Sequence, residues 1–162
     1  MTDTRNTAGV IAPPPLIALG AIVLGVLLDW LMPAYLLSAL LTRNGRIVIS
    51  VLLIATGAAL AVAARGTFVR LGTNVNPYRP SSVLVTTGIF AYLRNPMYVG
   101  LAFLVAGIGV ALASDWTLVM LVAAALVIHF GVVKREERYL EVKFGDAYRR
   151  YKGAVPRYGL PF

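Results

Sequence analysis

Residues 88–98, GIFAYLRNPMY, decide the fold, because this polar stretch lies between two long apolar runs. A guanidinium, a carboxamide and a phenol are costly to bring to a bilayer boundary unless something polar is bound there. Pro96 disfavours helix at the residue before it and suits the first turn of a new helix. Asn95 then falls at the N-cap, where its side chain can accept a backbone N–H. The stretch predicts a polar loop entering the positive end of a membrane helix, a place suited to an anionic group.

The composition indicates an integral membrane protein. Of 162 residues, 59% are hydrophobic and 14% are charged, whereas soluble domains are about 45–50% apolar. There is no cysteine and one histidine, so we expect neither disulfides nor a metal site. The net charge of +8 does not indicate nucleic acid binding, because the basic residues flank apolar runs, where positive charge reports topology.

Four apolar runs approach the length that crosses a bilayer. They cover residues 16–32, 47–64, 97–113 and 116–133. Residues 42–46 are a turn by composition, and a tight turn at Ser114 makes the last two runs an antiparallel hairpin. We expect a single membrane domain, with residues 1–64 as an N-terminal helical pair and residues 65–162 as its core.

The chain changes character after residue 133. Residues 134–138 (KREER) continue the last helix out of the membrane, and residues 146–152 form a second, amphipathic helix. Basic residues concentrate here and in the connection 65–94, so the positive-inside rule places both on the cytoplasmic face. The predicted fold is an all-α integral membrane bundle of about four to five transmembrane helices in a bacterial-type inner membrane. Its C-terminal cytoplasmic segment encloses a pocket, and Arg43 and Arg46 lie on the far side.

Polar side chains gather on the predicted cytoplasmic face: Arg94, Asn95, Tyr98, Glu136, Glu137, Arg149, Arg150 and Arg157. Neighbouring glutamates point about 100° apart on a helix, so one can face the bundle while the other meets solvent. Acids at a helix C-terminus oppose the macrodipole, which favours a compensating cation or hydroxyl; a solvated charged helix end is the alternative. His129 precedes Glu136 by seven residues, on nearly the same helical face. It is either functional or a hydrogen-bonded packing residue.

Two ordered motif blocks resemble the isoprenylcysteine carboxyl methyltransferase group, whose core is similar to that of the phospholipid N-methyltransferases. The first block is TNVNP at 73–77, VTTG at 85–88 and RNPMYVG at 94–100. The second is REE at 135–137, Leu140, FG at 144–145, Tyr148, Tyr151 and VPR at 155–157 before Pro161. The sequence departs from the commoner pattern at Ile89, Ala91 and Asn95, where proline, arginine and histidine are frequent.

The resemblance implies an S-adenosylmethionine-dependent methyltransferase built of membrane helices. The implied cofactor-binding residues are Arg94, Asn95, Pro96, Tyr98, Gly107, Gly109, Glu136 and Glu137. We expect Arg94 and the helix start to receive the cofactor carboxylate, and Glu137 to accept ribose hydroxyl or ammonium hydrogens. The expected catalytic residues are Arg94, Glu137 and His129, with His129 or a glutamate as the base for an amine acceptor. Gly107 and Gly109 equally fit helix packing.

The expected partners are membrane lipids and a lipophilic methyl acceptor that enters from the bilayer, with no nucleic acid and no metal. A prenylated cysteine carboxylate, a phospholipid amine and another small lipophile all remain open. Two other classes of function also remain. One is an NADPH-dependent membrane reductase of related architecture. The other is a non-enzymatic membrane assembly protein, in which Arg94 and Glu137 would be structural.

Overall fold

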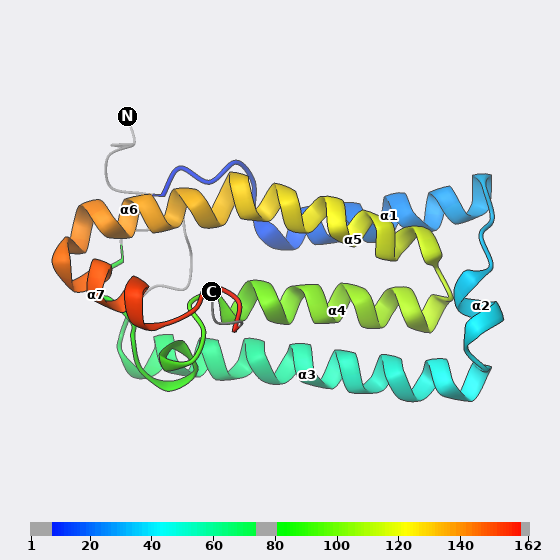
Figure 1. The fold of residues 1–162 in the computed structure, drawn as a ribbon, viewed down its shortest axis with the longest axis horizontal. Coiled ribbons are helices and arrows are strands. Elements are labelled where there is room, and N and C mark those ends of the chain that lie inside the picture. The colour runs from blue at the N-terminus through cyan, green and yellow to red at the C-terminus, as the bar shows by residue number, and fades with distance from the viewer. Residues whose placement is uncertain (1–7, 74–80, 160–162) are drawn as a thin grey trace.

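The computed structural model describes residues 8–73 and 81–159 (Figure 1). The elements in chain order are α1 (Pro14–Leu31), α2 (Leu36–Leu40), α3 (Arg43–Arg70), the 3₁₀ turn η2 (Gly88–Ala91), α4 (Pro96–Leu112), α5 (Asp115–Ile128), the π-helical turn η3 (His129–Val133), α6 (Lys134–Phe144) and α7 (Asp146–Ala154). No strand occurs in these residues, which confirms the all-α prediction.

The long helices α1, α3, α4 and α5 lie side by side and form a bundle (Figure 1). α3 packs against α4, α1 packs against α5, and α4 also contacts α1 and α5. α6, α7 and the loop before α4 stand at one end of the bundle, and α2 stands at the other. Arg43 and Arg46, at the start of α3, therefore lie at the end opposite the basic tail, as a four-helix path requires.

Three helices among the described residues are long and apolar enough to cross a membrane: α1, α3 and the continuous helix Asp115–Phe144. The apolar helix α4 is shorter, and its 17 residues lie at the lower limit of the crossing range. Large apolar side chains on these helices are exposed, among them Leu16, Leu27, Val51, Leu52 and Val122. An apolar surface of this extent suits contact with lipid, and the protein is an all-α membrane bundle.

The two ends of α3 differ from the sequence prediction. The predicted turn at 42–46 was wrong, because the Thr42 hydroxyl accepts a hydrogen bond from Gly45 N at 3.2 Å and caps a helix that begins at Arg43. The helix also continues beyond Ala64 and through Gly66 to Arg70, and it ends just before Gly72, where φ is +61°. Residues 74–80, which the sequence marks as rich in turn formers, lie outside the described residues.

α3 and α4 approach each other closely at a pair of glycines. A Cβ added to Gly57 would lie 2.6 Å from the carbonyl oxygen of Gly100, and one added to Gly100 would lie 2.8 Å from that of Gly57. Small residues let membrane helices reach this separation. The contact fixes the position of α4, and therefore of the polar loop that precedes it.

Asp29 lies at the end of the bundle away from the tail, where it caps α5. Its carboxylate accepts hydrogen bonds from the Ser114 hydroxyl and, at 3.5 Å, from Trp116 N. The Ser114 hydroxyl in turn accepts from Thr117 N at 3.1 Å. A negative side chain at a helix N-terminus complements the macrodipole, so Asp29 has a structural role at this turn.

Candidate functional site

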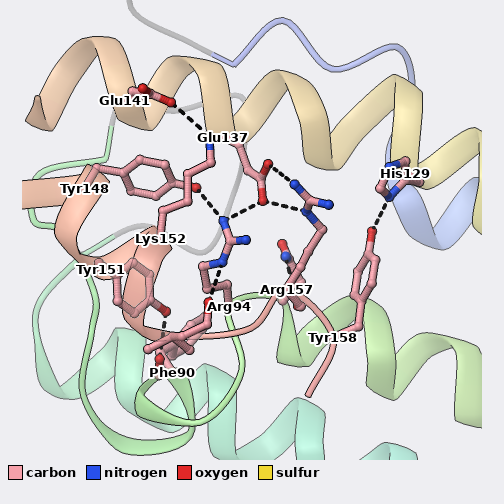
Figure 2. Close-up of polar contacts among 12 residues, drawn as sticks. Phe90, Arg94, His129, Glu137, Glu141, Tyr148, Tyr151, Lys152, Arg157 and Tyr158 are labelled. Carbon is pink, nitrogen blue, oxygen red and sulfur yellow. Dashed lines mark hydrogen bonds and ion pairs between the residues drawn. The ribbon is translucent and has the colours of Figure 1, made fainter. Parts of the chain in front are cut away.

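The loop before α4 is held beneath the C-terminal segment that follows α7 (Figure 2). The backbone N–H of Arg94 donates to Pro156 O at 3.0 Å, and its Nε donates to Val155 O at 2.9 Å. Asn95 Nδ2 donates to Arg157 O at 3.2 Å. Asn95 occupies the predicted N-cap, but its side chain makes no capping bond, so that part of the prediction was wrong. The side-chain amide of Asn95 donates instead to the carbonyl oxygen of Arg157 in the tail.

Glu137 lies at the centre of a group that we call the arginine–glutamate cluster, formed by Arg94, Glu137 and Arg157 (Figure 2). Glu137 Oε1 accepts from Arg94 Nη1 at 2.7 Å and from Arg157 Nε at 2.8 Å, and Oε2 accepts from Arg157 Nη2 at 2.8 Å. The side chains of Arg94 and Glu137 are only 8% and 9% exposed. Two guanidinium groups against one carboxylate leave a net positive charge, which can attract an anion.

Arg94 keeps hydrogen-bonding capacity in this arrangement. Its bonds in the described part of the chain use Nε and Nη1, the latter also reaching the Tyr148 hydroxyl at 3.4 Å. A guanidinium has five N–H donors, so the two on Nη2 remain for a further acceptor. The sequence placed Arg157 on the same face as Arg94 and gave Tyr148 as a motif position, but it did not predict the contacts of Arg157 with Glu137 and of Tyr148 with Arg94.

The other glutamate, Glu136, faces α4. Its Oε1 accepts a hydrogen bond from the Tyr98 hydroxyl at 2.7 Å. The sequence allowed one glutamate to face the bundle while the other met solvent; in the structure both face the protein, Glu137 toward Arg94 and Arg157 and Glu136 toward Tyr98. Both glutamates line one pocket of about 130 Å³. The predicted cofactor residues on that pocket are Arg94, Asn95, Pro96, Tyr98, Glu136 and Glu137.

A π-helical turn, η3, precedes the glutamates and was not foreseen. π turns interrupt the regular helical register and often accompany functional sites. The carbonyl of Gly131 in this turn accepts a hydrogen bond from Ile11 N at 3.3 Å, and Ile11 Cδ1 occupies the space that a Cβ on Gly131 would fill. Arg135 Nη1 adds a 2.8 Å bond to Gly9 O. The segment before α1 is thereby packed along the helix that carries both glutamates.

Tyrosines on α7 and in the tail surround the cluster. Tyr148 is 2% exposed, and burial together with the charge of Glu137 raises its pKa to about 12. Burial also raises the pKa of Tyr151, whose hydroxyl donates to Phe90 O at 2.7 Å, and that of Tyr158. These hydroxyls therefore stay protonated at neutral pH. The hydrogen bond to Glu137 raises the pKa of Arg157, which keeps this guanidinium charged.

The structure does not bring every predicted site residue to this pocket. A Cβ on Gly107 would lie 2.7 Å from Ile54 Cγ1 of α3, and one on Gly109 would lie 3.1 Å from Thr117 Cγ2 of α5. Both glycines therefore support helix packing, and their role toward a cofactor stays a prediction. Arg149 is exposed and pairs with Glu141 at 3.3 Å rather than with the cluster.

His129 lies beside the cluster, at a second and larger cavity of about 550 Å³. Its Nδ1 is 2.8 Å from the Tyr158 hydroxyl (Figure 2). Aliphatic residues of α4 and α5 form most of the cavity wall, and Ala18 of α1 and Leu53 of α3 complete it. Among the described residues, Tyr98 is the one that lines both cavities, so the polar pocket and the apolar cavity meet at its ring.

Comparison with known proteins bears on this arrangement. The family model described as phospholipid methyltransferase matches residues 45–147. Protein-S-isoprenylcysteine O-methyltransferase of Schizosaccharomyces pombe is 38% identical over 81 residues, covering 49% of this chain and 33% of that protein. The Xenopus laevis protein of the same name is 36% identical over 87 residues, covering 54% and 30%.

An uncharacterized protein of Haemophilus influenzae is 61% identical over 33 residues, covering 20% of this chain and 52% of that protein. No solved structure matches the chain. The matched stretches span about a third of the length of the two named relatives.

Proposed function

The chain belongs to the phospholipid methyltransferase family, and we propose that it transfers a methyl group from S-adenosylmethionine to a lipophilic acceptor. The observation that carries the proposal is the arginine–glutamate cluster beside the polar pocket. The cluster joins the loop before α4, the helix α6 and the C-terminal segment at the end of an apolar bundle. A water-soluble cofactor and a membrane-borne acceptor can meet at such a boundary.

The residues of the pocket fit the polar groups of this cofactor. A carboxylate finds the two N–H groups of Arg94 Nη2, in a charge-assisted bond of the kind that arginine forms well. Carboxylates accept hydrogen bonds only, so Glu136 and Glu137 suit the ammonium group and the ribose hydroxyls. Phe90 and Tyr139, which also line the pocket, offer aromatic faces for an adenine ring.

The pocket has to widen to admit a ligand of this size. Its volume of about 130 Å³ is below the roughly 300–1,000 Å³ of small-molecule sites. The C-terminal segment is held against the lining residues Arg94, Asn95 and Glu137, through bonds of the first two to carbonyls of residues 155–157 and through the Arg157–Glu137 pair. We propose that this segment moves outward to let the cofactor enter and then closes over it.

When bound, S-adenosylmethionine supplies an electrophilic methyl group. The chain then has to hold that methyl group in line with the acceptor nucleophile, and positioning of this kind can contribute about 7–11 kcal/mol to lowering a barrier. Arg94 and Glu137 hold the donor end of the site, and the C-terminal segment excludes water. Tyr98, at the junction of the two cavities, lies where donor and acceptor meet. His129 lies on the acceptor side and is the proposed base for an acceptor that carries a proton.

The acceptor enters the apolar cavity from the bilayer under this proposal. The basic tail and the basic loop before α4 stand at the same end of the bundle, and the positive-inside rule assigns that end to the cytoplasm. We therefore propose a cytoplasmic site and a cytoplasmic C-terminus in a bacterial-type inner membrane.

Calorimetric titration of S-adenosylmethionine into the detergent-purified protein tests the proposal. We expect micromolar binding, at least tenfold weaker in Arg94→Ala and Glu137→Gln because each removes a charge-assisted bond. Glu141→Gln is the matched control, since Glu141 lies on the same helix and pairs with exposed Lys152 outside the pocket. Absence of binding to the folded parent would refute the proposal. NADPH binding would then indicate a reductase, and binding of neither would indicate an assembly protein.

A further inference from the structure

The 550 Å³ cavity is apolar along its length and polar at one end. Its lining in the described part of the chain includes no lysine, arginine, aspartate or glutamate. The polar side chains on it are Tyr98, His129 and Tyr158. An occupant therefore meets aliphatic side chains along its body and uncharged hydrogen-bonding groups at its head.

His129 and Tyr158 form a defined pair at that polar end. The His129 ring is held by its 2.8 Å contact with the Tyr158 hydroxyl and by an edge-to-face contact with Phe130, at 4.7 Å between ring centroids. Tyr158 follows Arg157, whose charge is directed to Glu137 through two bonds of 2.8 Å. Arg157, the nearest cation of the tail, is thus paired with Glu137. The His129–Tyr158 pair itself offers both a hydrogen-bond donor and an acceptor.

We propose that the acceptor is a lipophile whose nucleophile is an uncharged N–H or O–H group, held by the His129–Tyr158 pair. The inference rests on the methyl transfer proposed above and names the acceptor class. A carboxylate would leave water for a cavity whose described lining offers it no cation, and burial of an unpaired charge is strongly unfavourable. A neutral amine or hydroxyl can both donate to and accept from the pair, so its polar hydrogens are satisfied on entry.

The proton-bearing nucleophile also gives His129 a chemical task. The nucleophile's lone pair forms the new bond to the methyl carbon, and the carbon–sulfur bond breaks with its electrons kept by sulfur. The nucleophile's proton passes to the neutral imidazole of His129, which becomes imidazolium and later releases the proton to water. A carboxylate acceptor would carry no such proton and would leave the histidine unused.

Three probes with one apolar body test the head-group preference on the unmodified protein: 4-octylaniline, 4-octylphenol and 4-octylbenzoate. Their binding to the full chain in lipid nanodiscs is measured without cofactor, with empty discs as the correction for partitioning. We expect the aniline and the phenol to bind at least tenfold more tightly than the benzoate, the factor that one satisfied buried polar group can supply. Equal or tighter binding of the benzoate overturns the proposal.

Variants then locate the head group. Tyr158→Phe and His129→Gln should each weaken aniline binding about tenfold and leave the binding of octylbenzene, which has no polar head, unchanged. Tyr35→Phe, which removes an exposed hydroxyl, is the matched control and should change neither. If both pair variants bind the aniline as the parent does, the pair does not hold the acceptor and the proposal fails.

Addition of S-adenosylmethionine separates this proposal from the one on which it rests. Methylated aniline or phenol, with no methyl ester of the benzoate, supports both. A methyl ester alone overturns the acceptor class and leaves methyl transfer standing. Failure of S-adenosylmethionine to bind refutes the methyl transfer, whereas the probe series on the unloaded protein still decides what the cavity prefers.

Discussion

Replacing Glu137 by glutamine should destabilise the protein more than the loss of an ordinary ion pair. The glutamate is 7% exposed and receives three arginine N–H bonds, two of them from Arg157. Glutamine keeps the shape and one acceptor oxygen, but it leaves the charge of Arg94, a side chain 8% exposed, without a counter-charge. Removing one partner of a buried ion pair leaves the other charge buried and unpaired. The loss of stability is therefore larger than the contribution of the intact pair.

The size of this destabilisation follows from the burial of the Arg94–Glu137 pair. Breaking a buried ion pair from one side costs about 3–5 kcal/mol. Arg157 is 21% exposed and can regain part of its solvation, so we expect a cost near the lower end of that range. In a domain of this size each kcal/mol shifts the melting temperature by about 2–4 °C, which gives a decrease of about 6–12 °C.

Thermal unfolding in detergent, followed by circular dichroism, measures the shift. Glu141→Gln is the control, because Glu141 lies on the same helix and also has two cationic partners, Arg149 and Lys152, but all three are on the surface. Exposed pairs contribute little, so its melting temperature should stay close to that of the parent. Equal shifts in the two variants would show that the cluster is solvated, and the reasoning would be refuted.

Three further predictions concern other parts of the molecule. Gly57→Ala should lower the melting temperature by separating α3 from α4, at a cost of about 1–3 kcal/mol; Gly66→Ala, where a Cβ on the same helix meets nothing within 4 Å, should not. Raising the pH from 10 to 12 should destabilise the protein, because the folded state holds the Tyr148 proton more tightly than the unfolded chain. Tyr148→Phe should reduce that loss, and exposed Tyr92→Phe should not. Gly131→Ala should displace Ile11 and speed amide hydrogen exchange in residues 8–12. Gly153→Ala is the control, because a Cβ there meets open space. Unchanged exchange in Gly131→Ala would contradict the packing of Ile11 against Gly131.

Local features of the site could be predicted from the sequence. Pro96 begins α4 and Asn95 stands at its N-cap, because the restrictions that proline imposes act on adjacent residues. The hairpin turn at Ser114 and the end of α6 at Gly145, where φ is +54°, have equally local causes. The motif resemblance also predicted that Glu136 and Glu137 share a pocket with the loop before α4. The spacing of these residues along the sequence could not predict this alone.

The contacts that complete the site depend on folding and could not be predicted. Asn95 loses its capping bond because a tail carbonyl, 62 residues later in the chain, takes its amide. Glu137 meets Arg157 only because the chain reverses between α6 and α7, so that the tail returns over the loop (Figure 1). The π turn at His129–Val133 gives no compositional signal, since its five residues would fit a regular helix equally well.

Both cavities are lined mostly by residues inside the family match at 45–147, and each also takes a few residues from outside it. The polar pocket takes Ala8, Tyr148 and Tyr151 from outside the match, and Arg157, also outside it, pairs with Glu137 on the pocket wall. The apolar cavity takes Ala18 from α1 and Tyr158 from the tail, both outside the match. Under the proposed methyl transfer, changes in α1 or at Tyr158 can therefore alter the acceptor cavity while the matched core is kept. The class of acceptor proposed for this chain accordingly rests on the apolar cavity and its His129–Tyr158 end.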